Sequence, residues 1–183
     1  MAYLGEEPTG STHPFSRITI QFGCKQPPGK PLPPKGSGII TQPEGTVLAP
    51  GLVHAYRSTD YQVGHPPRFT LRIGQASPEL LAEHEHHRVA SSAFITASNP
   101  YGKLLSAEAN DARFILLNGD LAARGLNADE GYGHDPSGKW PAERSLLVFG
   151  IDLDLARAIG GFHNQNAIVW NGEDGVPQLV LLR

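Results

Sequence analysis

The chain has 183 residues, 15 of them basic and 18 acidic, for a formal charge of -3, and it contains one cysteine, Cys24. This length can bury one hydrophobic core but is short for two full domains, and an acidic balance without a basic run gives no electrostatic reason to expect nucleic acid or an anionic membrane as partner. One cysteine excludes an internal disulfide and a cysteine-based zinc site, and the sequence lacks both an apolar run of membrane-spanning length and a basic, apolar leader, so we expect an unexported, cytoplasmic protein.

The first 50 residues form a Pro/Gly-rich segment that holds nine of the 16 prolines. Proline cannot continue a helix or donate a hydrogen bond inside a sheet, so residues 1–50 are predicted to be an arm or linker and residues 51–183 the folded domain. Within the arm, Arg17–Phe22 alternates apolar and polar residues and is predicted to form a short edge strand. The stretch Gln26–Pro34 has two interpretations, a plain linker or a polyproline ligand for a protein partner.

From residue 56 onward the composition changes to that of a folded domain. Two segments with period-2 alternation, 56–63 and 68–73, flank a Gly-His-Pro-Pro turn, and this pattern predicts a β-hairpin. The Ser-Pro-Glu sequence at 77–79 then supplies a capping residue, a first-turn proline and an early carboxylate. These three residues predict a helix that ends near His87.

The remaining elements are predicted in this order: a strand at 93–96, a helix from the capping residue Ser106 to Gly125, strands at 127–132 and 145–149, a helix at 152–159 stopped by Gly160 and Gly161, and strands at 167–170 and 178–182 joined by a turn at 171–175. When the segment at 127–132 is counted as a strand, the order from Ala93 is the split pattern of ferredoxin-like folds. The predicted fold class is therefore a single α+β domain with a mixed or antiparallel sheet and two or three helices, preceded by the Pro/Gly-rich arm.

The run Glu83-His84-Glu85-His86-His87 gathers five ionisable side chains at the end of a predicted helix. A helix places Glu83 beside His86 and His87, at spacings that can hold a divalent metal. The alternative is a solvated helix end, where imidazoles meet the negative end of the helix dipole. We favour the helix end and predict no metal site; the sequence identifies no cofactor.

The sequence has no nucleophile elbow, no phosphate-binding loop and no catalytic-cysteine context, which weighs against the common hydrolase and NTPase classes. Polar residues gather instead at the ends of predicted elements, where ligands commonly bind. These candidates are Thr96, Asn99, Asn110, Arg113, Gln165 and Asn166. Asn110 and Arg113 share a helix face, and Arg113 in an early turn can hold a carboxylate or phosphate. The alternative gives each residue a local role, as a cap, as a turn residue or, for Arg113, as the surface partner of Glu108 or Asp111.

Two further candidates lie in the Gly/Pro-rich connection before the strand at 145–149. Glu143 follows Trp140 and Pro141 and is a candidate general acid or base, provided that an apolar wall raises its pKa. His134 and Asp135 are adjacent and can form an oriented imidazole pair. The connection itself is either a lid over a site or a plain loop.

Several of these motifs occur together in order: residues 94–100 (FITASNP), 108–110 (EAN) followed by Arg113, 140–145 (WPAERS) and 164–168 (NQNAI). In combination they resemble the bacterial family catalogued only as domain of unknown function 3293, over roughly residues 56–183. The family pattern has a Trp-Pro-Glu-like stretch, whereas Ala142 separates Pro141 from Glu143 here. The resemblance implies no activity, but it favours one shared site over separate caps for the polar positions.

We therefore expect a site for a small polar or anionic, nucleotide-like metabolite, lined by the six polar residues, with Arg113 as the anion contact and Glu143 as the acid or base of any reaction. The protein is then a ligand-binding protein or an enzyme. The alternative is a noncatalytic interaction module that uses the Pro-rich arm or an exposed sheet edge. Nucleic-acid binding ranks last, because the two tryptophans form no stacking platform at motif spacing.

Overall fold

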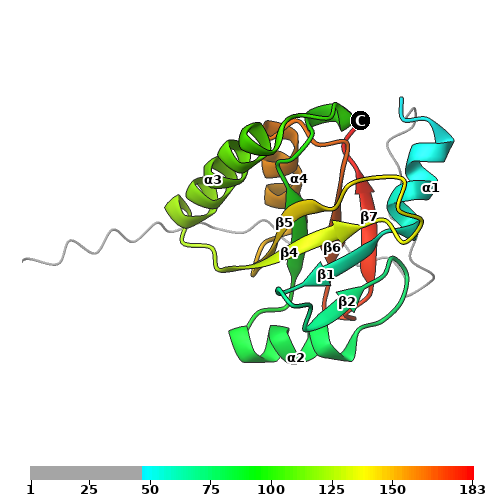
Figure 1. Ribbon diagram of the computed structural model, residues 1–183. Helices are drawn as coiled ribbons and strands as arrows, with labels where there is room; N and C mark the ends of the chain where they lie inside the picture. Colours follow the sequence, from blue (N-terminus) through cyan, green and yellow to red (C-terminus); the bar gives the residue numbers. More distant parts are fainter. Residues whose placement is uncertain (1–46) are drawn as a thin grey trace, which may run out of the picture. The chain divides into compact units, whose positions relative to one another are not determined.

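Seven strands form one sheet in residues 47–183, the part of the chain that the computed structural model describes (Figure 1). The strands are β1 (Asp60–Val63), β2 (Phe69–Leu71), β3 (Ser92–Thr96), β4 (Ala128–His134), β5 (Glu143–Phe149), β6 (Ala167–Asn171) and β7 (Pro177–Leu181). Their order across the sheet is β2-β1-β4-β5-β3-β6-β7, and every neighbouring pair is antiparallel. The predicted single α+β domain is confirmed, with the antiparallel form of the sheet.

Four α-helices and one short 3-10 helix accompany the sheet: α1 (Pro50–Ser58), α2 (Pro78–His87), η1 (Pro100–Gly102), α3 (Ala107–Ala123) and α4 (Leu153–Phe162). The prediction of two or three helices is thus wrong by one, since it missed α1. Of the predicted arm, only residues 47–50 belong to the described part, and the predictions for Arg17–Phe22 and Gln26–Pro34 lie outside it. Among the described residues, no helix has the length and apolar character needed to cross a membrane.

The segment 56–63 is not a single strand, as the sequence predicted, because its first residues belong to α1 and β1 begins at Asp60. Pro50 stands in the first turn of α1, where its fixed φ suits a helix and its missing N–H is not needed. Leu52 and Tyr56 lie four residues apart and line the same cavity, so they share one helix face. Tyr56 therefore belongs to a helical pattern that adjoins the period-2 pattern of β1.

The predicted boundaries at Ser77, Ser106 and Gly125 are confirmed. Ser77 Oγ accepts a hydrogen bond from Leu80 N at 3.1 Å and begins α2. Ser106 Oγ accepts from Ala109 N at 3.3 Å and begins α3. Gly125 follows α3 with a φ of +69°, the left-handed conformation that glycine adopts without steric cost.

Helix α4 is longer than predicted, because Gly160 and Gly161 lie inside it. A Cβ atom at position 160 would approach side-chain atoms of Ile168 and Leu182 to 2.7 Å. Gly160 is therefore where the helix packs directly against the sheet, and its missing side chain permits this contact. Gly160 thus marks close packing and not a helix end, whereas a Cβ at Gly161 would meet nothing within 4 Å.

The two faces of the sheet carry different covers. Helices α3 and α4 lie over one face, and this core contains Ala93, Ile95, Leu117, Leu121, Leu146, Val148 and Ile159. Alternate residues of the same strands point to the opposite face, where Tyr61, Phe94, Leu147, Phe149 and Val169 pack with Leu80 of α2. The sheet curls around this second face as a half-barrel, so the second face is concave.

The element order expected from Ala93 is observed as β3-α3-β4-β5-α4-β6. Helix α3 links β3 to β4, which lie on either side of β5, and α4 links β5 to β6, which lie on either side of β3. The first residues of β5 and the last residues of β3 consequently lie side by side, with Thr96 opposite Ser145. This register brings Glu143 close to the loop that follows β3.

Candidate functional site

The concave face is covered by α2 at one end and by α1 at the other (Figure 1). Between α1 and the sheet lies a chamber of about 110 Å³, called the inner chamber below. Four aromatic residues, Tyr56, Tyr61, Phe94 and Trp140, line it. The rings of Tyr61 and Phe94 pack edge to face with their centroids 5.4 Å apart, so this part of the wall is closely packed.

A wider outer cleft of about 730 Å³ adjoins the inner chamber and shares Tyr56 and Trp140 with it. Its wall adds the ring of Tyr101 and two basic side chains, His54 and Lys139. Trp140 is 52% exposed although it lines both spaces. Its indole therefore stands at the junction between the outer cleft and the chamber.

A third hollow of about 450 Å³ lies against Asn99 and Asn110. Glu143 lines this hollow, the outer cleft and the inner chamber, and Pro141 does so as well. The segment from Pro141 to Glu143, which leads into β5, therefore lies between the three spaces. The Glu143 side chain is thus accessible to a ligand from each of them.

Burial raises the pKa of the Glu143 carboxyl, and a hydrogen bond from Asn99 partly opposes this shift. Asn99 Nδ2 donates to Glu143 Oε1 at 2.8 Å. Trp140 and Pro141 line the same chamber as Glu143, so the apolar wall expected from the sequence is present. The proposed acid or base role remains a prediction, now with a physical basis for an elevated pKa.

Asn99 and Asn110 form a double hydrogen bond that fixes the loop after β3. Asn99 N donates to Asn110 Oδ1, and Asn110 Nδ2 donates to Asn99 Oδ1, each at 3.0 Å. Asn99 Oδ1 also accepts from Leu105 N at 2.9 Å. Asn99 has a φ of +47°, a left-handed conformation that asparagine tolerates better than most residues. It is thus both the turn residue of one interpretation and a partner of Glu143.

Arg113 and Gln165 donate hydrogen bonds to the main chain of this loop and line none of the three spaces. Arg113 Nε donates to Ala97 O at 2.6 Å, and its Nη2 donates to His163 O at 2.7 Å. Gln165 Nε2 donates to Ser98 O at 3.0 Å. Two guanidinium nitrogens of Arg113 therefore hold main-chain carbonyls, and the surface pairing with an acidic neighbour is not what the structure shows.

Thr96 and Asn166 complete the set of predicted residues. Thr96 lines the inner chamber, and its Oγ1 donates to Arg144 O at 2.8 Å. Asn166 is 3% exposed, and its Nδ2 donates to the Tyr56 hydroxyl at 3.2 Å. Asn166 Oδ1 is buried without a hydrogen-bond partner among the described residues. Thr96, Asn99 and Asn110 thus line the spaces directly, and Asn166 contacts them through Tyr56.

Tyr56 is the site residue that sequence reasoning missed, because it was assigned to a strand. Burial raises the pKa of its phenol, and the nearby carboxyl of Glu143 contributes in the same direction. The helical spacing of Leu52, Ala55, Tyr56 and Thr59, all of which line the chamber, is the signal that identifies it. Asp135 also lines the chamber, but its carboxylate accepts hydrogen bonds from Ser137 and from Lys139 N within its own loop.

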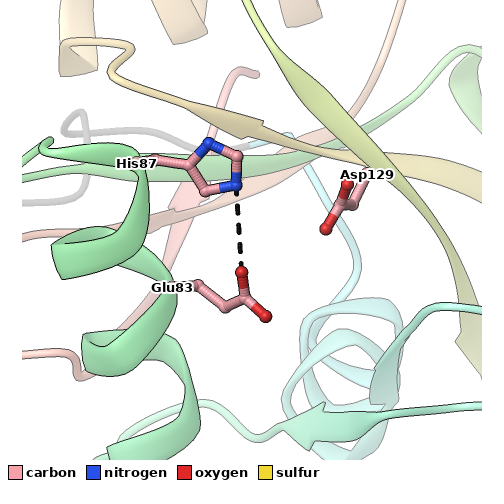
Figure 2. A group of neighbouring side chains, drawn as sticks. All are labelled: Glu83, His87 and Asp129. Carbon is pink, nitrogen blue, oxygen red and sulfur yellow. Dashed lines mark ion pairs between the residues drawn. The ribbon is translucent and has the colours of Figure 1, made fainter.

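The predicted histidine cluster has a different composition in the structure. Figure 2 shows Glu83 and His87 of α2 facing Asp129 of β4, and one ligand atom of each lies within 4.8 Å of the others. His86 is not a member of this group, so the proposed Glu83, His86 and His87 set is corrected. Arg68 bridges the two carboxylates, with Nη1 at 2.5 Å from Glu83 Oε1 and Nη2 on Asp129 Oδ2. A guanidinium thus already occupies the position of a counter-ion.

The described part of the chain is an α+β unit with cavities on the concave face of an antiparallel sheet. Residues 95–168 match the family described as Protein of unknown function (DUF3293), and the chain carries a DUF3293 domain there. The resemblance seen in the sequence is confirmed over this range, which includes Glu143 and all six polar candidates. Neither a curated protein nor a solved structure matches the chain.

Proposed function

We propose that this protein binds a small polar or anionic metabolite between α1 and the concave face of the sheet, and acts on it with Glu143 as acid or base. The observation that carries the proposal is the position of Glu143, whose carboxyl is shared by three adjoining spaces and fixed by Asn99. Active sites commonly combine a concave pocket with a residue of perturbed pKa. Glu143 provides both features.

The outer cleft supports a nucleotide-like ligand with an anionic end. Tyr101 and Trp140 offer partly exposed rings for a planar group, at 45% and 52% exposure. His54 and Lys139 line the same cleft and supply positive charge for a carboxylate or phosphate. Because Arg113 is held by main-chain carbonyls, we transfer the role of anion contact to Lys139.

Glu143 has the surroundings of a general acid. A carboxyl whose pKa is raised by burial keeps its proton to higher pH and can deliver it to a bound ligand. Asn99 occupies Oε1, so Oε2 is the oxygen available to carry that proton. After transfer, the Asn99 amide stabilises the carboxylate that remains.

The central strands also support the finer fold assignment. The order β4-β5-β3-β6, with helical connections across β5 and across β3, is the arrangement of the ferredoxin-like split βαβ pattern. On this assignment, β1 and β2 extend one edge of the four-stranded core and β7 extends the other. The inner chamber then lies on the face that the two crossover helices leave open.

A noncatalytic role is the second candidate, favoured by apolar side chains on the helical face. Ile115 and Leu116 of α3 are 68% and 64% exposed, and Phe162 of α4 is 74% exposed. Exposed apolar groups of this size are typical of protein contacts when they form one patch. This candidate predicts that substitutions on α3, and none in the cleft, abolish partner binding.

A thermal-shift screen of the full chain tests the metabolite proposal, with nucleotides, sugar phosphates, amino acids and cofactors as probes. A ligand at 100 times its dissociation constant stabilises the fold by about 2.7 kcal/mol, which is readily measured. We expect a stabilising compound whose effect is lost in Trp140→Ala and kept in the remote control Phe162→Ala. A compound that stabilises Trp140→Ala as much as the wild type contradicts the proposal, and so does a screen in which no compound stabilises the protein.

A further inference from the structure

The inner chamber has an unusual set of polar groups for a site meant to hold an anion. Two acidic residues, Asp135 and Glu143, line it, and no lysine, arginine or histidine of the described chain does. No asparagine or glutamine side chain lines it either. The basic residues of the region, His54 and Lys139, belong to the outer cleft. Asp135 and Glu143 line the outer cleft as well, so the chamber differs from the cleft in lacking a basic side chain among the described residues.

The hydroxyl groups of the chamber add to its negative character. Thr96 Oγ1 donates to Arg144 O at 2.8 Å, and Ser145 Oγ donates to Glu143 O at 3.0 Å. The Tyr61 hydroxyl likewise donates to Tyr56 O at 2.7 Å, and Thr59 Oγ1 to Ala55 O at 2.9 Å. Each hydroxyl has one hydrogen and two lone pairs. With its hydrogen held by a main-chain carbonyl, each of these four groups has only lone pairs left to offer, and one lone pair of Thr96 Oγ1 already accepts from Ser98 N at 3.0 Å.

Few donors remain in the chamber. Among the lining side chains these are the Tyr56 hydroxyl and the Trp140 indole N–H. The Tyr56 oxygen already accepts from Asn166 Nδ2 at 3.2 Å. The rest of the wall is aliphatic or consists of the aromatic rings of Tyr56, Tyr61, Phe94 and Trp140, whose faces attract cations. Hydrogen-bond acceptors and ring faces therefore dominate the space.

We propose that the inner chamber holds a primary ammonium group of the ligand, with Glu143 as its counter-ion and the acceptor hydroxyls as its hydrogen-bond partners. An ammonium ion has three donors and no acceptor, so it suits a wall of lone pairs. A buried cation needs an opposite charge and complete hydrogen bonding, and the chamber provides both. This inference rests on the proposed function, specifies its ligand as an amine, and selects the base role for Glu143, because a carboxylate beside an ammonium has no proton to donate.

The basic side chains, which line only the outer cleft, orient such a ligand. Its ammonium end enters the inner chamber beside Glu143, and an anionic end extends into the outer cleft toward Lys139. The ring of Trp140 lines both spaces and contacts the part in between. The ligand class is an amine that carries an anionic or planar group at its far end.

The inference predicts a specific dependence of affinity on pH. In the free protein, burial raises the pKa of Glu143, and an adjacent ammonium favours the carboxylate and lowers that pKa again. Binding therefore releases a proton, and affinity rises with pH through the pKa of the free protein. A neutral acceptor or an anion in the chamber gives the opposite sign, because it favours the protonated carboxyl.

The test uses the full chain and three compounds of matched size: n-butylammonium, butan-1-ol and butyrate. Dissociation constants are measured by calorimetry at up to about 50 mM compound, from about pH 5 to pH 8, where the amine stays protonated. We expect n-butylammonium to bind at least about tenfold more tightly than either analogue, with affinity that increases with pH. Glu143→Gln should reduce this affinity by about tenfold or more and remove its pH dependence.

Two variants make the result interpretable. Asp154→Asn removes the same charge at an exposed position of α4 and should leave the affinity for n-butylammonium unchanged. Ser145→Ala removes one acceptor and should weaken ammonium binding even if Glu143→Gln does not fold. Tighter binding of butan-1-ol or butyrate, the opposite pH dependence, or no binding of n-butylammonium overturns the inference. If n-butylammonium does not bind as expected but the thermal-shift screen finds a metabolite whose effect depends on Trp140, only the assignment of the ligand as an amine is refuted. If the screen finds no such metabolite, the proposed function itself is refuted.

Discussion

The side-chain amide of Asn99 donates to Glu143 Oε1 at 2.8 Å and joins the loop after β3 to the first residue of β5. The two residues are 44 positions apart in the sequence. Asn110 holds the other side of Asn99, so the Glu143 carboxyl is positioned by residues far from it in the sequence. This arrangement makes Glu143 a half-buried acid whose side chain is held by hydrogen bonds.

Glu143→Gln is predicted to stabilise the protein at neutral pH. Burial raises the folded-state pKa of this acid above its ordinary value of 4.5, so the native state holds more protons than the unfolded state between the two pKa values. The free energy of unfolding therefore falls as pH rises through that window, and the glutamine variant is free of this loss. Chemical denaturation from pH 4 to pH 8 measures the difference, which should grow with pH.

Glu130→Gln is the matched control with the opposite sign. The Arg144 guanidinium donates to both carboxylate oxygens of Glu130 and lowers its pKa. Glu130 therefore contributes stability above its unfolded-state pKa that is lost as pH falls, and the variant should be less stable at neutral pH. Because both side chains are over a third exposed, this effect is modest. If both variants change the free energy of unfolding at neutral pH in the same direction, the opposite pKa shifts assigned to Glu143 and Glu130 are contradicted.

Arg113→Met is predicted to destabilise the fold by about 1 to 3 kcal/mol, since it leaves Ala97 O and His163 O without their donor. Arg113→Lys should fall between this variant and the wild type, because one ammonium replaces two separate donors. Equilibrium denaturation gives the difference. A normal stability for Arg113→Met, with ligand binding lost, supports instead the original prediction that Arg113 contacts an anion.

Two glycine substitutions should have opposite effects. A Cβ at Gly131 in β4 would lie 2.4 Å from Gln62 O and 2.8 Å from the Phe94 ring, so Gly131→Ala should cost about 2 kcal/mol or more, because a main-chain oxygen cannot swing aside. A Cβ at Gly119 in α3 meets nothing within 4 Å, and Gly119→Ala should add about 0.5 to 1 kcal/mol. Melting temperatures of the two variants test this. A stable Gly131→Ala protein is incompatible with the described contact between β1 and β4.

Arg68→Ala is predicted to create zinc affinity at the group formed by Glu83, His87 and Asp129. In the wild type a zinc ion must displace the guanidinium that bridges the two carboxylates. Without that guanidinium the imidazole and both carboxylates are available as ligands. Calorimetric titration should show at least about tenfold tighter zinc binding than in the wild type.

Adding His87→Ala to Arg68→Ala serves as the control for this prediction. The double variant keeps both carboxylates and loses the nitrogen ligand, so the gain in zinc affinity should disappear. If zinc binds the wild type as tightly as Arg68→Ala, the guanidinium does not compete with the metal. The histidine-rich end of α2 is then a metal site in its own right.

The sequence by itself determined the features that depend on a few neighbouring residues. Ser77 and Ser106 cap α2 and α3 through bonds to residues three positions ahead, and Gly125 closes α3, so these boundaries follow from local chemistry. The short apolar runs of β3 and β5 predicted two buried strands, and both are central in the sheet. The pattern failed at Tyr56, where a helical period and a strand period adjoin, and at Gly160, which a sequence cannot distinguish from a helix stop.

Only the tertiary structure decided which polar residues share a site. Glu143 meets Asn99 because β5 pairs with β3 in one register, and Arg113 meets Ala97 O because α3 packs against the sheet. Whether a hydroxyl offers its hydrogen or its lone pairs to a ligand depends on which carbonyl it reaches, as Thr96 shows, whose partner Arg144 O lies 48 positions away. These pairings link segments far apart in the chain, and their geometry arises only when the strands pair and the helices pack on the sheet.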